Sequence, residues 1–167
     1  LVAGPCEVAL PIGEPGIEVV SVVSAQEMYE AVASRFDGCD LFVAAAAVAD
    51  YRPASRLAGK RKKQPGDSGD TWTLELVPNP DILHTMGQRK RPGQTVVGFA
   101  LEVDDALAHA RDKLERKRCD WLVLNGPANC GDASEPLMLL RADGTVEELH
   151  PPSKEAAATE LVARILD

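Results

Sequence analysis

The sequence predicts a layered α/β domain built on a mainly parallel sheet. Two largely apolar runs, 40–48 and 94–101, are typical of strands that are buried on both faces of such a sheet. Segments with helical spacing lie between the strand-like runs, and this alternation indicates βαβ units. The chain has 167 residues, of which 45% are apolar and 26% charged. These values suit a single domain over residues 1–167, with no linker dividing it.

The first part of the chain is predicted to hold two strands and a helix. Residues 1–4, LVAG, read as the end of a strand with nothing before it, which indicates a fragment of a longer protein. The β-branched run 16–24 predicts a second strand. A helix is expected over 24–36, because Ser24 and Glu27 match the S-x-x-E capping box and apolar residues follow at helical spacing.

Between residues 50 and 70 the composition shifts to Pro, Gly, Lys, Arg and Asp, which predicts a long loop or flap. Structureless loops of this length are uncommon in compact domains unless they are functional or disordered. The alternating run 71–77 predicts a strand. A helix is expected over 79–88, with Asn79 at the N-cap and Pro80 at the first helical position.

The remaining elements continue the alternation. Segment 104–118 is predicted to be a helix, acidic at its start and basic at its end, as the helix dipole favours. Residues 119–125 predict a further strand, and residues 137–149 predict a hairpin that turns at Asp143 and Gly144. The last predicted element is a helix over 153–166 with a serine at its cap position.

Composition argues against several classes of function. The formal net charge of -8 repels polyanions, which argues against general nucleic-acid binding. No apolar stretch approaches the roughly 20 residues needed to cross a bilayer and no basic leader opens the chain, so we expect a cytoplasmic protein. The four cysteines form no CxxC pair and the three histidines lie far apart. This spacing does not favour a protein-bound metal such as zinc, and we expect reduced, partly buried thiols.

Ligands of open α/β sheets bind beyond the carboxyl ends of the strands. Asp50, segment 99–102 and Asn125 lie at the ends of predicted strands. Asp50 could accept hydrogen bonds from a sugar hydroxyl or a base amino group; alternatively, it pairs with Arg52 or caps a turn. The basic run KRKK, residues 60–63, is either a solvated loop tip or a flap whose lysines close on a triphosphate.

Two further features could bind phosphate. Lys113 and Lys117 are four residues apart and therefore share one face of the predicted helix, although an ordinary basic last turn would look the same. The segment NPDIL, residues 79–83, could present free backbone N–H groups at a helix start or simply cap it. The sequence has no GxGxxG and no P-loop, and no Ser-His-Asp arrangement can be assembled from it. Taken together, these features fit a nucleotide triphosphate site at one edge of the sheet.

Seven motifs follow one another in a recognisable order: SAQEM, AAAAVADYRP, GKRKK, VPNPDIL, VVGFALE, ARDKLERKRCDWLVLN and a late SK. This order resembles that of phosphopantothenate–cysteine ligase, also called phosphopantothenoylcysteine synthetase, the second activity of the bifunctional coenzyme A biosynthesis protein of bacteria. The resemblance covers nearly the whole chain. It implies a Rossmann-like, three-layer α/β fold with a long Lys-rich flap and a C-terminal hairpin, working as a homodimer.

The resemblance also implies the chemistry. The family activates the carboxylate of 4'-phosphopantothenate with CTP and Mg²⁺ to form an acyl-cytidylate, and cysteine then displaces CMP. FMN serves only the decarboxylase half that bacteria usually fuse in front, and that half is absent here. Lys60 is implied to assist the chemistry on the acyl-cytidylate. The nucleotide-binding positions are implied to be Ala44, Ala45, Ala46, Asp50, Lys60, Pro80, Asp81, Ile82, Leu83, Phe99, Lys113 and Lys117.

The sequence departs from the family pattern in three places. A glycine-rich segment, whose asparagine binds the acyl intermediate, normally precedes a strand ending like LVAGP and is missing here. Residues 98–103 read GFALEV where the family often has GFAAET, and the loop after Asn125 lacks the usual Phe and Asn. These departures concern substrate contacts and leave the nucleotide motifs intact.

Two other classes of function stay open at this point. The missing N-terminal segment favours a non-catalytic α/β module that binds a nucleotide. A nicotinamide-dependent oxidoreductase is the third class, and the absent glycine fingerprint counts against it. The preference for CTP over ATP rests on the resemblance alone, and the hairpin at 137–149 is a candidate dimer element.

Overall fold

The computed structural model of the protein describes residues 1–60, 72–102, 104–126 and 136–167. The chain divides into two compact units, the first made of residues 1–29 and 47–81 and the second of residues 30–46 and 82–167. Each unit has sheet structure of its own. In the part of the chain that the structure describes, no helix is long and apolar enough to span a bilayer.

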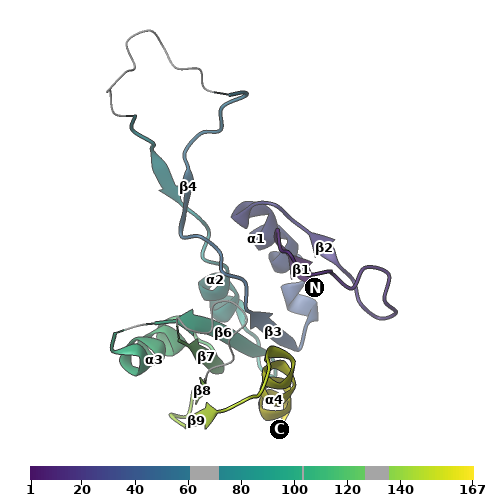
Figure 1. Ribbon diagram of the computed structural model, residues 1–167, viewed down its shortest axis with the longest axis vertical. Coiled ribbons are helices and arrows are strands. Elements are labelled where there is room, and N and C mark those ends of the chain that lie inside the picture. Colours follow the sequence, from purple (N-terminus) through teal and green to yellow (C-terminus); the bar gives the residue numbers. More distant parts are fainter. Residues whose placement is uncertain (61–71, 103, 127–135) are drawn as a thin grey trace. The chain divides into compact units, whose positions relative to one another are not determined.

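The second unit contains a five-stranded sheet in the order β3-β6-β7-β8-β9 (Figure 1). The first three of these strands pair in parallel, and β8 is antiparallel to both of its neighbours, so only β8 points against the others. This arrangement confirms the predicted mainly parallel sheet. The strands are β3 Leu41–Ala44, β6 Thr95–Leu101, β7 Trp121–Asn125, β8 Leu137–Arg141 and β9 Val146–Leu149.

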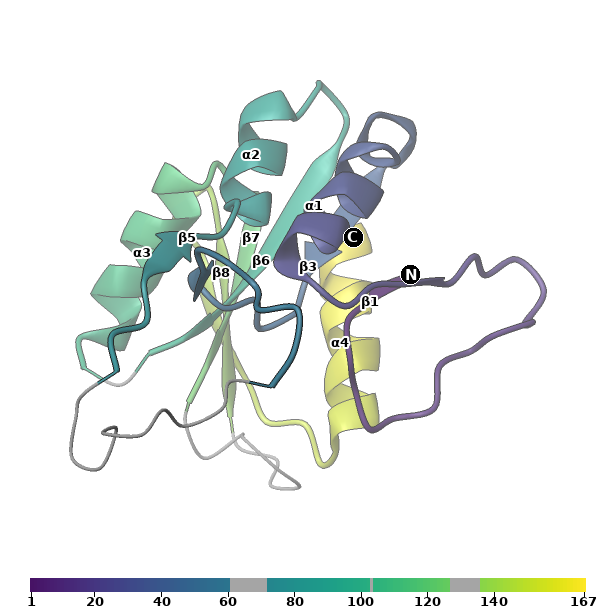
Figure 2. The same ribbon diagram turned by 90° about the horizontal axis from the view of Figure 1, so that it is seen from above.

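Helices cover both faces of this sheet, which gives the predicted three layers (Figure 2). Helices α2 (Ile82–Arg89) and α3 (Ala106–Arg116) lie on one face, where Ala110 packs in a cluster with Leu122 and Leu140. Helix α4 (Lys154–Leu166) lies on the other face, where Leu161 packs in a second cluster with Val97 and Val123. Successive residues of β6 and β7 thus enter opposite clusters, as strand geometry requires.

The outer strand β3 differs from the prediction. The apolar run 40–48 predicted a strand buried on both faces, but only Leu41–Ala44 is a strand, and Val43 keeps 44% of its surface exposed. In the five-stranded sheet β3 is an end strand, paired only with β6. A strand at the end of a sheet has a neighbouring strand on one side only, so its side chains are less buried. The apolar run alone did not reveal that β3 takes this end position.

Two glycines allow α2 to pack closely. A Cβ atom at Gly87 would clash with the backbone oxygen of Lys117, just after α3. A Cβ atom at Gly98 in β6 would lie 2.8 Å from a methyl group of Leu83 and 2.9 Å from one of Leu122. The absence of a side chain at both positions therefore sets how near α2 lies to the sheet and to the end of α3.

Polar side chains tie together the amino ends of the strands. Asp120 accepts a hydrogen bond from Lys90 at 2.7 Å with one oxygen and from the Val96 N–H at 2.7 Å with the other. The buried amide of Gln94 donates to the backbone oxygens of Phe36, at 2.6 Å, and of Cys39, at 2.8 Å. Phe36 opens the 3-10 helix η1 (Phe36–Gly38). These contacts hold η1 and the starts of β6 and β7 together at the amino edge of the sheet.

The first unit contains two small sheets. Strands β1 (Val2–Ala3) and β2 (Val20–Ser21) pair in parallel, and strands β4 (Tyr51–Pro53) and β5 (Leu76–Pro78) pair in antiparallel fashion. The strands predicted over 16–24 and 71–77 are thus present but much shorter. The predicted flap, 50–70, begins with strand β4, which the sequence analysis did not expect, and residues 61–71 lie outside the described residues.

Several local signals are confirmed. In the capping box before α1 (Ala25–Ala33), Glu27 N–H donates to Ser24 Oγ at 3.2 Å, and Ser24 N–H donates to Glu27 Oε2 at 3.0 Å. Ser153 Oγ accepts from the N–H of Ala156 at the start of α4. The β8–β9 hairpin turns at Gly144, whose φ of 94° is a conformation that favours glycine.

We expect Gly87→Ala to lower the free energy of unfolding by about 1–3 kcal/mol, because an added methyl group must displace the backbone of Lys117. This is the net loss that remains after the roughly 1 kcal/mol that alanine gains over glycine inside a helix. Urea unfolding would measure it. The matched control is Gly38→Ala, an exposed position with nothing within 4 Å of the new atom, which should shift stability little. Equal urea midpoints for Gly87→Ala and the wild type would contradict this account of the packing.

Candidate active site

Asp50 lies at the base of the β4–β5 ribbon in the first unit. Its backbone oxygen accepts a hydrogen bond from the N–H of Asn79 at 2.7 Å, just beyond the last pair of the ribbon, Tyr51 with Pro78. The neighbouring Arg52 reaches across the ribbon and donates to the backbone oxygen of Pro78 and to Asn79 Oδ1. Among the described contacts there is no ion pair between Arg52 and Asp50, whose side chain is exposed. The carboxylate of Asp50 therefore remains accessible to a ligand.

Asn79 does not cap α2, contrary to the sequence prediction. Its Nδ2 donates to the backbone oxygen of Ala49 at 2.8 Å, and its Oδ1, the atom that a cap would use, accepts from Arg52 at 3.3 Å. The side chain thus joins the two chain segments at the base of the ribbon. Because these partners lie 27 and 30 residues away along the sequence, local sequence gave no sign of them.

Helix α2 begins at Ile82, two residues later than predicted. Pro80, which has no N–H to offer an anion, and Asp81 both precede it. Ile82 is buried, and Leu83 packs beside Gly98 of β6. The free amides at this helix start therefore belong to Ile82 and the residues that follow it.

Lys60 lies in the predicted flap, is exposed, and is the last described residue before the gap at 61–71. The other basic residues of the KRKK run, 61–63, lie outside the described residues, so the closing of the flap on a triphosphate stays a prediction. Lys60 and Asp50 both belong to the first unit, as do Pro80 and Asp81.

The sheet of the second unit positions the predicted apolar contacts. Ala44 is the last residue of β3 and pairs in register with Gly98 of β6, and Ala45 and Ala46 continue beyond it as exposed residues. Phe99 follows Gly98 and therefore faces the other side of the sheet, where it packs against the cluster under α4.

The two predicted lysines of α3 differ from each other. Lys113 lies in the last turn and is partly exposed, whereas Lys117 follows the helix and keeps only 8% of its surface exposed. Because α3 joins the parallel strands β6 and β7, it runs from the carboxyl edge of the sheet back toward the amino edge. Lys113 and Lys117 therefore lie toward the amino edge of the sheet, whereas the sequence analysis grouped them with the other predicted phosphate-binding features at a single edge.

Cys119 is a buried neighbour of these lysines and a free thiol, as expected from the sequence. Its sulfur lies 3.3 Å from where a Cβ of Gly98 would be. Burial, and to a smaller extent the charge of Asp120, raises the pKa of the Cys119 thiol to about 11, although the three lysines Lys90, Lys113 and Lys117 act in the opposite direction. The thiol is therefore protonated at neutral pH and is a poor nucleophile.

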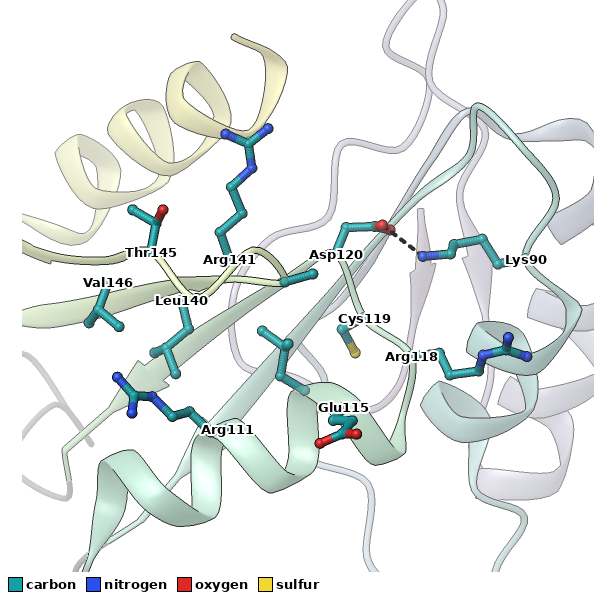
Figure 3. Close-up of a pocket in the computed structure, with 13 residues that line it drawn as sticks. Lys90, Arg111, Glu115, Arg118, Cys119, Asp120, Leu140, Arg141, Thr145 and Val146 are labelled. Carbon is teal, nitrogen blue, oxygen red and sulfur yellow. Dashed lines mark hydrogen bonds and ion pairs between the residues drawn. The ribbon is translucent and has the colours of Figure 1, made fainter.

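A hollow of about 500 Å³ lies at the amino edge of the second unit, between α3 and the β8–β9 turn (Figure 3). Leu114, Leu140 and Val146 supply its apolar lining, and the Lys90–Asp120 ion pair borders it. None of the residues assigned to the nucleotide by resemblance lines it. This hollow is therefore distinct from the predicted site.

The family model of the DNA/pantothenate metabolism flavoprotein C-terminal domain matches residues 1–167. A cysteine/cysteine sulfinic acid decarboxylase from an unknown prokaryotic organism is 34% identical over 170 residues, covering 99% of this chain and 46% of the relative. The coenzyme A biosynthesis bifunctional protein CoaBC of Mycobacterium tuberculosis is 42% identical over 164 residues, covering 90% of this chain and 38% of the relative. The chain thus spans less than half the length of these curated relatives.

Solved structures show the same fold. The crystal structure of the C-terminal domain of CoaBC superposes with a TM-score of 0.78 and 31% identity, covering 98% of this chain and 70% of that one. A Cab2 variant in complex with phosphopantothenate-cysteine gives a TM-score of 0.63 at 23% identity, covering 87% of this chain and 52% of that one. The second likeness concerns the fold alone.

We expect alkylation by iodoacetamide at mildly alkaline pH to modify the exposed Cys6 quickly and to leave Cys119 unmodified in the native chain. The raised pKa leaves almost no thiolate at Cys119, and burial blocks the reagent. Peptide mapping by mass spectrometry would follow both sites, with the urea-unfolded chain as the control in which both react. Equal rates at Cys6 and Cys119 in the native chain would contradict the burial described here.

Proposed function

The chain belongs to the family of DNA/pantothenate metabolism flavoprotein C-terminal domains, and on this premise we propose that it is the phosphopantothenate–cysteine ligase domain of a coenzyme A biosynthesis protein. The observation that carries the proposal is the identity to CoaBC across most of the chain. The fold shared with the C-terminal domain of CoaBC supports it. The proposal includes a cytoplasmic location, which suits the free thiols of Cys39 and Cys119.

The proposed reaction has two steps. A carboxylate oxygen of 4'-phosphopantothenate attacks the α-phosphorus of CTP, the bond to the β-phosphate breaks, and pyrophosphate leaves. The cysteine amine then attacks the acyl carbon of the acyl-cytidylate, the bond to the phosphate oxygen breaks, the nitrogen loses a proton, and CMP leaves. Activation is required because a free carboxylate has only oxide as a leaving group, whereas a nucleotide phosphate is a stable one.

The residues of this chain fit separate parts of that reaction. The exposed carboxylate of Asp50 can accept hydrogen bonds from the nucleotide, and the exposed ammonium of Lys60 can reach negative charge that develops on the phosphates and on the acyl oxygen. The amides of Ile82 and Leu83 at the start of α2 can donate to a phosphate. The ring of Phe99 offers an apolar surface for the base.

Magnesium fits this set as part of the nucleotide substrate. Within the described ranges no group of three or more His, Cys, Asp or Glu side chains could hold a metal ion. Mg²⁺ is commonly bound by substrate phosphates with only one or two protein carboxylates, and Asp50 is an exposed carboxylate of this kind. The ion would neutralise charge on the triphosphate.

We expect Lys60→Ala to weaken the binding of CTP with Mg²⁺ by roughly tenfold or more, because hydrogen bonds to charged groups contribute about 1.5–3 kcal/mol and about 1.4 kcal/mol is a factor of ten. Isothermal titration calorimetry would measure both dissociation constants. Arg56→Ala is the matched control, since it removes an exposed positive charge from the same segment. If the folded wild type does not bind CTP, or if both variants lose the same affinity, the proposed role of Lys60 is wrong.

We also propose that the active form is a homodimer that pairs through the β4–β5 ribbon. Large apolar side chains are exposed along the ribbon and the segments leading to it: Tyr51, Leu57, Trp72, Leu74 and Leu76 are between 48% and 61% exposed. By contrast, the large apolar residues of the 137–149 hairpin are mostly buried within their own unit, including Leu137, Leu139, Leu140 and Leu149. A second copy of the chain would cover the ribbon's apolar surface.

Leu76→Asp should therefore weaken self-association by at least about tenfold, since it places a charge in the centre of the proposed interface. Sedimentation equilibrium of the wild type and the variant would measure the change. Leu166→Asp serves as the control, because Leu166 is an exposed leucine near the C-terminus and outside the ribbon. A wild type that is monomeric, or a variant that dimerises like the wild type, would rule out the ribbon as the dimer surface.

A further inference from the structure

Asn125 ends β7 with an unpaired acceptor. The four residues before it in the strand, Trp121 to Leu124, are apolar and buried. Its Oδ1 is also inaccessible to solvent, yet it has no hydrogen-bond partner within the described residues, and it is the one buried side-chain nitrogen or oxygen there in this state. Leaving a buried acceptor unsatisfied costs free energy, whereas a leucine would continue the apolar strand without that cost. An asparagine here is thus explained by a donor that the described residues do not supply.

The position of Asn125 indicates where that donor would come from. Asn125 pairs in register with Leu101 at the end of β6, so both lie at the carboxyl edge of the parallel strands. This edge is where open α/β sheets bind their ligands. Helix α4 follows β9, which runs in the same direction as β7, so α4 begins at this edge too.

The face of the sheet on which Asn125 lies further restricts where the donor would be. Trp121 and Val123 belong to the cluster under α4, so strand alternation puts Asn125 on that same face. Phe99 packs against the same cluster and pairs in register with Val123, one alternation back from the Leu101–Asn125 pair. The ring of Phe99 and the acceptor of Asn125 therefore lie one after the other on this face, toward the carboxyl edge of the sheet. A planar base stacked on the ring would bring its polar edge to the acceptor.

We propose that Asn125 is a specificity residue, whose Oδ1 accepts a hydrogen bond from the exocyclic amino group of the bound nucleotide base. The inference rests on the proposed nucleotide-dependent function and deepens it. Cytosine presents an amino group at position 4, whereas uracil presents a carbonyl oxygen there. With UTP two acceptors would face each other. The hydrogen bond therefore raises the affinity for CTP, and the unpaired acceptors lower the affinity for UTP. Asn125 would thereby supply a preference for CTP over UTP, which charge attraction between lysines and phosphates cannot supply, because the two nucleotides carry the same triphosphate.

The test compares CTP and UTP binding, each with Mg²⁺, in the wild type and in Asn125→Leu. We expect the wild type to bind CTP at least about tenfold more tightly than UTP. In Asn125→Leu, which keeps the volume but removes the acceptor, the ratio should fall to within about threefold, chiefly because CTP binds more weakly. The loss of Oδ1 should not lower the variant's melting temperature, since that atom has no hydrogen-bond partner among the described residues. Calorimetry and thermal unfolding provide the two readouts.

Two further measurements keep the inference testable if Asn125→Leu does not fold. Asn125→Asp retains an acceptor and should retain the preference for CTP, whatever its added charge does to both affinities. In the wild type, the triphosphate of 2-pyrimidinone riboside, which carries only hydrogen at position 4, should bind less tightly than CTP and more tightly than UTP. Loss of the preference in Asn125→Asp, or equal binding of the three nucleotides, would overturn the inference.

The outcomes separate this inference from the function on which it rests. If the wild type binds CTP and UTP equally, or if Asn125→Leu keeps the wild-type ratio, the role of Asn125 is wrong while nucleotide binding stands. If the folded wild type binds none of these nucleotides, the proposed function fails and the inference fails with it.

Discussion

The close contact of α2 with the sheet and with the end of α3 is the constraint on which the second unit depends. It exists only because Gly87 and Gly98 lack side chains, one against the backbone of Lys117 and the other against Leu83 and Leu122. Close packing of this kind leaves no room for even one methyl group. It also fixes functional positions, because Leu83 lies in the first turn of the helix proposed to hold a phosphate and Lys117 is buried in the same contact. Stability and the proposed chemistry therefore share these two glycines.

The two edges of the sheet have different physical character. At the amino edge, buried and partly buried polar groups find partners inside the protein: Asp120 joins Lys90 to Val96, and Gln94 joins Phe36 to Cys39. At the carboxyl edge, the end of β7 leaves Asn125 Oδ1 without a partner among the described residues. An edge whose polar groups are satisfied contributes to stability, whereas an unsatisfied buried group is stabilised only when a ligand supplies the missing hydrogen bond. This difference supports a ligand site at the carboxyl edge, as the fold predicts.

Sequence reasoning succeeded where structure depends on neighbouring residues. The capping box at Ser24, the cap at Ser153 and the turn at Gly144 each involve atoms within a few residues, and all three are confirmed. It failed where distant partners decide. Asn79 satisfies its side chain with Ala49 and Arg52 and so leaves α2 uncapped by it. The run at 40–48 predicted a fully buried strand, but β3 has only one strand neighbour in the five-stranded sheet.

The sequence by itself determined the α/β class, the order of the elements in the second unit and the family, because periodicity, caps and ordered motifs are properties of short segments. It also singled out Asp50, which follows an apolar run, and Lys60, which begins a basic run. Only the tertiary structure decided that Phe99 and Asn125 lie on the same face near one edge, that Lys117 is buried, and that Asn125 Oδ1 has no partner in the part of the chain that the structure describes. The physical reason is that these facts depend on the register between strands and on packing between helices. Contacts of that kind join residues more than 20 positions apart, and no local pattern in the sequence specifies them.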